Sequence, residues 1–237
     1  MVHFHNILVN YFPSGSAGSP MTHCEIKLVP WEEGGCDPND PKRPCGEIAI
    51  SGDCVTIGYY KNEELTNSSY SVDQKTGKRW FYTGDIGLAT PDGNIRIVDR
   101  RKDIIKLSHG EYVSLVKIES QISTNPLVDI VCVLPEKSMQ HLHALIIPNR
   151  ERTKQFLISS KLADDASDIQ TLLETPNICA AVSQNIKSNS FKGLNRYETP
   201  SEVHVLADIW TPENNHITPT IKIKRNEIAK HYSSLLR

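Results

Sequence analysis

Residues 80–113 read WFYTGDIGLATPDGNIRIVDRRKDIIKLSHGEYV, and the two halves of this stretch have different patterns. In the first half, two runs that favour β-strands flank a PDG turn at 91–93, which is a strong hairpin signal. In the second half, the charged segment 99–103 separates this hairpin from two shorter strand-like runs, 104–107 and 111–113. The stretch therefore predicts that a β-rich region ends just before the charged segment and that a different fold begins after it.

The residues before this stretch have the pattern of short strands and turns. Residues 24–29 alternate apolar and polar side chains, and residues 46–50 form a second strand-like run. The segment 14–20 is rich in glycine and serine, but it lacks a Gly-Lys-Ser/Thr ending and no helical pattern follows it. We interpret it as a turn before a strand and not as a phosphate loop. Residues 1–98 are therefore expected to form a β-rich unit, with a barrel-like or sandwich-like arrangement.

Strand and helix patterns alternate after the charged segment. Ser114 is a candidate N-cap for a helix whose apolar face holds Leu115, Ile118 and Ile122. Further strands are expected over 130–134, 142–147 and 202–206, and further helices over 151–162, after Pro176 and at the C-terminus, where Ile228, Tyr232, Leu235 and Leu236 share one face. Residues 104–237 are therefore expected to form a small α+β domain.

Composition excludes several classes of protein. The 237 residues hold 26 Lys and Arg and 28 Asp and Glu, so the chain lacks the basic excess of a general nucleic-acid or membrane-surface binder. No apolar run approaches the ~20 residues that span a bilayer, and the first residues do not form a secretory signal. The 6 cysteines are scattered without a C-x-x-C pair, which favours free thiols in a reducing compartment over a zinc site.

Two short motifs and one lysine are candidates for chemistry. Asp85 follows a glycine between strand-like residues, where a carboxylate can accept hydrogen bonds from the vicinal hydroxyls of a ribose. The segment 99–103 places three cations between two acids, and Lys222 lies in a second basic segment. Taken singly, Asp85 also fits an ordinary turn residue, and the segment 99–103 also fits a solvated strand end with surface ion pairs. Lys222 by itself also fits a surface lysine.

Taken in order, these motifs resemble the adenylate-forming acyl-CoA synthetase superfamily. The similarity lies in TGDIG at 83–87, the PDG hairpin, IVDRRKDIIKL at 97–107 and GEYVS at 110–114. GEYVS and ITPTIKIKR at 217–225 are similar to the long-chain fatty acyl-CoA synthetase branch. The resemblance runs from about Gly15 to the C-terminus, and the glycine-rich segment is itself similar to a family segment that is not the phosphate loop.

This resemblance implies an enzyme, an AMP-forming acid–thiol ligase. Such enzymes make an acyl-adenylate from ATP and a carboxylic acid, release pyrophosphate, and then pass the acyl group to the thiol of coenzyme A. The expected substrates are a fatty acid, ATP and CoA, with Mg²⁺ as a further cofactor and no nucleic acid as partner. By position, Asp85 matches the ribose-binding aspartate, Arg100 matches the arginine near the ribose and phosphates, and Lys222 matches the catalytic lysine.

The resemblance also implies a two-domain arrangement with a pivot. Residues 1–98 would be the end of a large AMP-binding domain, 99–103 a hinge in which Lys102 matches the hinge position, and 104–237 a small mobile domain. Rotation about the hinge would remove Lys222 from the site after adenylation. The ribbon that carries Lys106, Gly110 and Glu111 would then form the thioester and CoA face, with Gly110 admitting the pantetheine arm.

Other family motifs are expected upstream and are not found in these residues. They include the phosphate loop, the segment that contributes to adenine stacking and to most of the Mg²⁺ ligands, and the acyl tunnel. The chain is thus expected to correspond to the C-terminal portion of a synthetase, as a truncated gene model or a real short product, and to be inactive in adenylation by itself. We expect an intracellular location, in the cytoplasm or on the cytosolic face of an internal membrane.

Two alternatives stay open at this point. A relative that activates an aryl or short-chain acid would share most of these motifs, because the acyl pocket is not in this sequence. A non-catalytic module that binds a nucleotide or a partner protein would keep the fold without the chemistry. The presence of Asp85, Arg100 and Lys222 together speaks against the second alternative.

Overall fold

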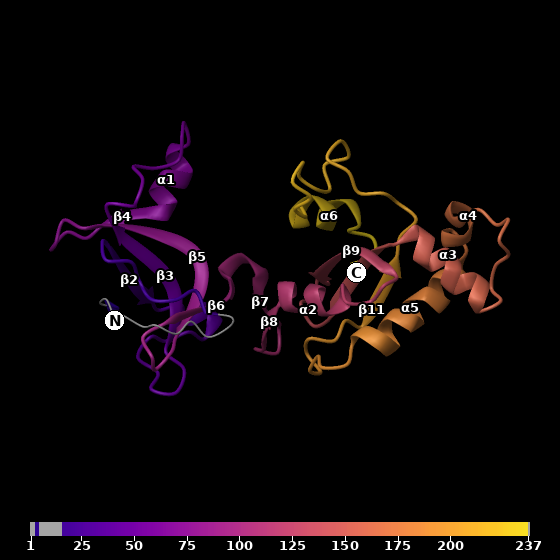
Figure 1. Ribbon diagram of the computed structural model, residues 1–237, viewed down its shortest axis with the longest axis horizontal. Helices are drawn as coiled ribbons and strands as arrows, with labels where there is room; N and C mark the ends of the chain where they lie inside the picture. Colours follow the sequence, from indigo (N-terminus) through magenta and orange to yellow (C-terminus); the bar gives the residue numbers. More distant parts are fainter. Residues whose placement is uncertain (1–2, 5–15, 237) are drawn as a thin grey trace. The chain divides into compact units, whose positions relative to one another are not determined.

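The computed structural model describes residues 3–4 and 16–236, and these form two compact units (Figure 1). The first unit ends at Ile104 and the second begins at Ile105. Helices and strands are mixed in the chain, so the predicted α+β class is confirmed. Ser14 and Gly15, at the start of the glycine-rich segment, lie outside the described residues, as do 1–2 and 5–13.

The first unit is built on a six-stranded sheet in which every pairing is antiparallel. Its strands are β1 (His3–Phe4), β2 (Cys24–Val29), β3 (Cys45–Gly52), β4 (Tyr70–Val72), β5 (Arg79–Ala89) and β6 (Ile95–Arg100), with the 3-10 helix η1 (Glu32–Gly34) and helix α1 (Glu63–Ser69) between them. The order is β1-β2-β3-β5-β4, and β6 pairs with β5. The predicted strands at 24–29 and 46–50 and the hairpin around the PDG turn are confirmed.

This sheet is open, which corrects the barrel-like arrangement expected for residues 1–98. A barrel needs its last strand to pair with its first. Here β3 occupies one edge of β5, and β4 and β6 share the other edge at the two ends of this long strand. In the described part of the chain, neither β4 nor β6 pairs with β1.

Two small apolar clusters stabilise the first unit. Leu28 and Ile48 are register partners on β2 and β3 and pack with Ile95 of β6. Trp31 and Ile86 pack on Cys36 and Cys45 in the second cluster. The glycine-rich segment adds to this sheet, because Gly18, with φ of 87°, forms a bridge with Ile95. The described residues 16–20 of this segment therefore extend the β-structure by pairing with β6.

The second unit begins with a two-stranded ribbon and continues as a three-stranded sheet with helices. Its elements are β7 (Ile104–Lys106), β8 (Tyr112–Ser114), α2 (Leu115–Ile122), β9 (Val128–Pro135), β10 (Leu142–Pro148), α3 (Arg150–Ser159), α4 (Ile169–Leu173), α5 (Pro176–Ser190), β11 (Glu202–Val205) and α6 (Arg225–His231), and the 3-10 helix η2 (Arg101–Asp103) precedes β7. The predicted ribbon is confirmed, and the Ser114 hydroxyl accepts a hydrogen bond from the Lys117 N–H at 3.0 Å, as expected of an N-cap.

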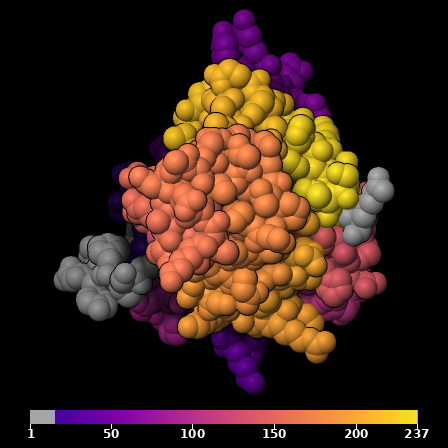
Figure 2. Space-filling view, turned by 90° about the vertical axis from the view of Figure 1, so that its right-hand side faces the viewer, coloured from indigo at the N-terminus to yellow at the C-terminus, as the bar shows by residue number. Residues whose placement is uncertain are grey.

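Helices cover both faces of the β11-β10-β9 sheet (Figure 1). Because successive side chains of a strand point to opposite faces, Val133 and Ala144 pack with α2 and α5, whereas Leu134 and Leu145 pack with Ile228 of α6. This arrangement explains why β9 and β10 contain continuous apolar runs rather than alternating ones. Figure 2 shows the α3 to α5 segment beside the C-terminal segment on one face of the molecule.

The structure differs from the predicted elements at the C-terminus and between α3 and α5. The terminal helix ends at His231. Tyr232 and Leu236 lie in the turns that follow it, and both side chains are buried. The short helix α4 has no extended apolar period, so its sequence did not predict it. In the part of the chain that is described, no helix combines the length and the apolar character that crossing a bilayer requires. The 6 cysteines are free thiols.

Candidate functional site

Asp85 and Arg100 lie directly opposite each other on neighbouring strands of the first unit. The register of β5 and β6 pairs the two residues, and 3.5 Å separates the Arg100 Nε from the Asp85 Oδ1. Their side chains are 34% and 68% exposed, so both can still contact a ligand. A carboxylate that accepts from hydroxyls and a permanent cation that attracts phosphate are thus held side by side.

Neighbouring backbone and side-chain groups fix the position of Asp85. Gly84 has φ of 75°, a conformation that favours glycine, and its N–H donates to the Glu47 Oε1 at 3.1 Å. The Thr83 hydroxyl donates to the Ile48 carbonyl at 2.9 Å and accepts from the Asp85 N–H at 3.1 Å. The part of β5 directly before the carboxylate is therefore tied to β3 by two hydrogen bonds.

Glu47 is a residue of this site that sequence reasoning did not identify. It is 8% exposed, and its second carboxylate oxygen, Oε2, lies 3.2 Å from the Arg101 Nη1. The Arg101 Nη2 also lies 3.6 Å from the Glu33 Oε2. Glu47 therefore joins Gly84, the residue before Asp85, to Arg101, the residue after Arg100. The signal in the sequence was an acid inside the short strand 46–50, where an apolar side chain would be usual.

A small hollow opens beside Asp85. It has a volume of about 180 Å³, and five isoleucines line it together with Thr83, Asp85 and the Ala17-Gly18-Ser19 segment. Ligand pockets usually measure about 300–1,000 Å³. The hollow is therefore large enough for one part of a nucleotide, such as a sugar, rather than for the whole molecule.

Lys102 is exposed in the middle of η2, the single turn of 3-10 helix between β6 and β7. One compact unit ends and the next begins two residues later, at Ile104 and Ile105. The connection between the units is thus short and lacks a buried side chain within η2 itself.

The predicted thioester residues share the β7–β8 ribbon of the second unit. Lys106 places its Nζ 5.3 Å from the centroid of the Tyr112 ring. Gly110 has φ of 96°, and a Cβ atom built on it would have no neighbour within 4 Å. Glu111 is exposed, and its carbonyl accepts from the Leu107 N–H at 2.8 Å. The tip of the ribbon therefore needs glycine for its backbone conformation and leaves space next to it.

Lys222 lies at the end of a tight loop in the second unit. Ile217 and Ile223 form a bridge across the base of this loop. Inside it, the Thr218 N–H donates to the Lys222 carbonyl at 2.8 Å, and the Thr218 hydroxyl accepts from the Lys222 N–H at 3.0 Å. Ile221 has φ of 60°, a strained value for a β-branched residue. The loop thus holds the backbone of Lys222 firmly and leaves its side chain exposed.

An ion pair with little exposure anchors the chain directly after this loop. Arg225, the first residue of α6, makes a bidentate contact with Glu119 of α2, in which the Nη2 and Oε2 atoms are 3.1 Å apart. The same guanidinium donates to the Val133 carbonyl at 2.9 Å, and Glu119 accepts from the Val133 N–H at 2.7 Å. Since β9 is the edge strand of its sheet, the pair also satisfies backbone groups that an open edge would leave unpaired.

Comparison with known proteins identifies the family. The chain is 38% identical to "Long chain acyl-CoA synthetase 8" of Arabidopsis thaliana over 223 residues, which are 94% of this chain and 31% of that protein. It is 36% identical to "Fatty acyl-CoA synthetase B" of Dictyostelium discoideum over 224 residues, 94% of this chain and 32% of that protein. The chain belongs to the adenylate-forming acyl-CoA synthetase superfamily. Within it, these relatives place the chain in the long-chain branch.

Solved structures of adenylate-forming enzymes share the fold of this superfamily member. One is the A-PCP didomain of a carboxylic acid reductase from Segniliparus rugosus in complex with AMP, at a TM-score of 0.67 and 28% identity, with 89% of this chain and 27% of that one covered. Another is the adenylation domain of a carboxylate reductase from Mycobacterium chelonae, at a TM-score of 0.69 and 25% identity, with 94% and 33% covered. No family model matches the chain.

The chain spans about a third of the length of the curated relatives that it matches. Of the predicted site residues, the structure brings Asp85 and Arg100 into contact, and it places Lys106, Gly110 and Glu111 on one ribbon. Among the described residues, no group of three or more His, Cys, Asp and Glu side chains is placed to hold a metal ion.

Proposed function

We propose that this chain forms the ribose-binding edge, the hinge and the mobile domain of an AMP-forming long-chain fatty acid–CoA ligase. The observation that carries the proposal is the pairing of Asp85 with Arg100 across β5 and β6, at 3.5 Å. The similarity to long-chain acyl-CoA synthetases over 94% of the chain supports the choice of substrates. The substrates are a long-chain fatty acid, ATP and CoA, and the products are acyl-CoA, AMP and pyrophosphate.

In the first half-reaction, a carboxylate oxygen of the fatty acid attacks the α-phosphorus of ATP, and pyrophosphate leaves. Asp85 accepts hydrogen bonds from the ribose hydroxyls, and Arg100 offsets phosphate charge beside them. Lys222 contacts the fatty-acid carboxylate and the α-phosphate, where negative charge grows in the transition state. ATP is expected to carry Mg²⁺, but the described residues contain no cluster that fits the ion, so we assign it no ligand here.

In the second half-reaction, the CoA thiol attacks the acyl carbon and AMP leaves. A rotation about Lys102 withdraws Lys222 and brings the β7–β8 ribbon to the acyl-adenylate. Gly110 leaves space for the pantetheine arm, and Lys106 and Glu111 flank it on the same ribbon. One small domain thereby serves two reactions, because it presents two different faces.

Replacing Asp85 by alanine is expected to weaken AMP binding to the chain by about tenfold or more, because a hydrogen bond to a charged group contributes about 1.5–3 kcal/mol. Isothermal titration calorimetry with AMP measures the loss. The Asp53→Ala variant is the matched control, because it removes an exposed carboxylate from the turn after β3 in the same unit.

A ligand pair makes this test specific for the ribose. Wild-type protein should bind AMP more tightly than 2′,3′-dideoxy-AMP, whereas Asp85→Ala should bind the two with similar affinity. Equal loss of affinity for both nucleotides in the variant would argue against a contact with the hydroxyls. AMP binding that is insensitive to Asp85 would contradict the proposed ribose site.

Replacing Lys102 by proline is expected to slow thioester formation much more than adenylation, because proline fixes φ near −65° and restricts rotation. The test uses a chimera in which residues 16–237 replace the matching segment of the Arabidopsis relative. Pyrophosphate release from ATP and palmitate reports the first half-reaction, and acyl transfer from preformed palmitoyl-adenylate to CoA reports the second. Lys102→Ala, which keeps the backbone free to turn, is the control. An equal loss in both half-reactions would show that the residue is not a pivot.

A further inference from the structure

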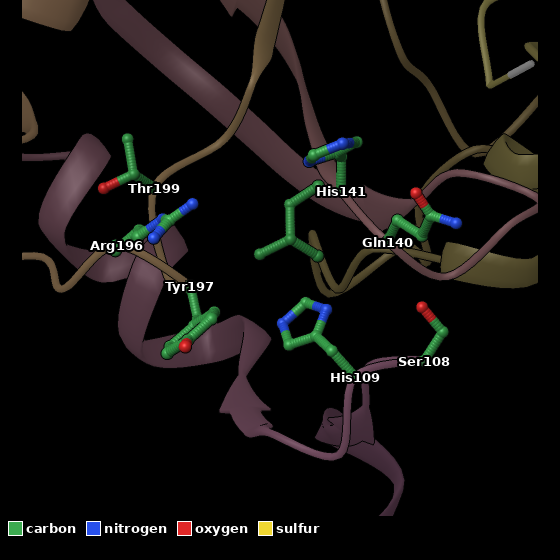
Figure 3. Close-up of a pocket in the computed structure, with 8 residues that line it drawn as sticks. Ser108, His109, Gln140, His141, Arg196, Tyr197 and Thr199 are labelled. Carbon is green, nitrogen blue, oxygen red and sulfur yellow. The ribbon is translucent and has the colours of Figure 1, made fainter.

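Two further features of the chain carry reactive or polar side chains. One is a pocket of about 480 Å³ in the second unit, whose lining includes His109 and Tyr197 with their ring centroids 4.9 Å apart (Figure 3). Because this pocket adjoins Gly110 at the tip of the β7–β8 ribbon, it belongs with the thioester face proposed above. The other feature is a pair of cysteines in the first unit, Cys24 and Cys54, that none of the proposed roles uses.

The sulfur atoms of Cys24 and Cys54 are 2.9 Å apart. Cys24 is the first residue of β2, and its register partner on β3 is Gly52, two residues before Cys54. Cys54 is exposed and Cys24 is half-buried, so a small molecule in solution can reach the pair. A disulfide bond is about 2.05 Å long, so a small movement of the two side chains would close one.

The backbone holds the two cysteines in this position. The Val55 N–H donates to the Gly52 carbonyl at 3.0 Å and closes the turn that carries Cys54. Gly52 has φ of 136°, and a Cβ atom built on it would lie 2.2 Å from the carbonyl oxygen of His23, the residue before Cys24. Only glycine allows the turn to approach the start of β2 this closely. The contact between the two thiols is therefore preorganised by the fold.

The other cysteines are protected from oxidants. Cys36, Cys45 and Cys132 are buried, and burial raises the pKa of Cys36 and of Cys132 to about 12. Cys179 is half-buried, and its thiol donates to the Leu173 carbonyl at 2.9 Å. The accessible thiolate is the form of cysteine that reacts, so burial and a high pKa make these thiols slow to oxidise.

We propose that Cys24 and Cys54 are a peroxide-sensitive pair that closes to a reversible disulfide. The Cys54 thiolate attacks one oxygen of hydrogen peroxide, which leaves a sulfenic acid on Cys54 and releases one water molecule. The Cys24 sulfur then attacks the sulfenic sulfur, and a second water molecule leaves. The two thiols together lose two electrons and two protons, and the peroxide is reduced to water.

The order of these steps follows from the surroundings of the two thiols. Cys54 is the more exposed of the two, so it meets the peroxide first. The pKa of Cys24 is raised, chiefly by its hydrogen bond to Cys54 and then by burial. Cys24 therefore stays protonated at first and can donate its hydrogen bond to the Cys54 thiolate.

The disulfide would constrain one end of the β2–β3 ladder. It ties the turn after β3 to the first residue of β2, and the nearby register partners Ile26 and Ile50 both line the hollow beside Asp85. Oxidised protein should therefore exchange the backbone amide hydrogens of β2 and β3 more slowly than reduced protein. Unchanged exchange in fully oxidised protein would contradict this constraint.

The full chain, reduced and then treated with hydrogen peroxide, tests the proposal by differential alkylation and mass spectrometry. Wild-type protein should lose two of its 6 free thiols and yield a peptide in which Cys24 and Cys54 are linked, and dithiothreitol should restore both thiols. Cys24→Ser should form no link and should leave a sulfenic acid on Cys54 that dimedone traps. Cys179→Ser is the matched control, because it makes the same substitution at a half-buried thiol of the second unit and should form the link as wild type does.

Three results would overturn the proposal. They are the absence of a Cys24–Cys54 peptide after peroxide treatment, a link that forms only between two chains, and a loss of the link in Cys179→Ser as large as that in Cys24→Ser. The measurement involves no nucleotide, acyl group or CoA. Its outcome is therefore independent of the proposed function and of the test on Asp85.

Discussion

Replacing Lys222 by alanine is expected to slow acyl-adenylate formation by about 10²- to 10³-fold, the loss typical of removing one group that stabilises developing charge. The structural basis is local. The Thr218–Lys222 loop is closed by two hydrogen bonds and by the Ile217–Ile223 bridge, so the exposed ammonium group starts from a well-defined backbone position. A flexible surface lysine would have to be ordered in the transition state, at a cost in side-chain entropy.

The chimera with the Arabidopsis relative is the protein for this measurement. Pyrophosphate release from ATP and palmitate should fall in Lys222→Ala, whereas acyl transfer from preformed palmitoyl-adenylate to CoA should stay close to the parent rate. This difference is expected because the proposed rotation withdraws Lys222 before the thiol attacks. A similar loss in both half-reactions would contradict a role confined to adenylation.

Lys224→Ala provides the matched control for the same basic segment. The Lys224 Nζ contacts the Asn215 Oδ1, so this lysine is occupied within its own loop. If positive charge in the segment were all that mattered, the two variants would lose similar activity. A loss in Lys224→Ala as large as that in Lys222→Ala would therefore favour a general basic surface over a specific catalytic lysine.

Replacing Arg225 by leucine is expected to lower the free energy of unfolding of the second unit by about 3–5 kcal/mol. The Arg225 and Glu119 side chains are only 21% and 11% exposed. Loss of the cation leaves the Glu119 charge with little access to water and removes the donor to the Val133 carbonyl. The cost of this uncompensated charge exceeds that of the lost contact itself.

Hydrogen-exchange mass spectrometry in increasing urea, read on peptides from β9 and α6, measures this loss in the second unit alone. Lys230→Gln is the control on the same helix, because it breaks an exposed ion pair with Glu227 and should change stability by less than about 1 kcal/mol. Equal stability of the Arg225→Leu and Lys230→Gln variants would show that the Arg225–Glu119 pair contributes no more than a surface contact.

Much of the secondary structure could be predicted from short-range patterns. Ser114 caps α2, and Ile118 and Ile122 are buried, as the period of the helix predicts. The PDG turn joins β5 to β6, and the apolar runs form β9 and β10. Such features depend on residues a few positions apart, so a single sequence contains the information. The barrel-like expectation was wrong because closure depends on which distant strands pair.

The residue types of the candidate site were also visible in the sequence. Asp85, Arg100 and Lys222 stood out through motifs in a recognisable order, and that order alone pointed to the family. Glu47 and the Arg225–Glu119 pair did not stand out, since Glu47 lies 37 positions from Gly84 and Arg225 lies 106 positions from Glu119. An acid among apolar residues of a strand or helix cannot be assigned a role from the sequence until its partner is known.

The sequence by itself determined the α+β class, the change of pattern around residues 99–103 and the chemical groups available for nucleotide binding. Only the tertiary structure decided that Asp85 and Arg100 face each other and that Glu47 accepts a hydrogen bond from the Gly84 N–H just before Asp85. It also decided that His109 and Tyr197 meet across one pocket. The physical reason is strand register and loop packing, because a shift of one residue would turn every side chain of a strand to the other face.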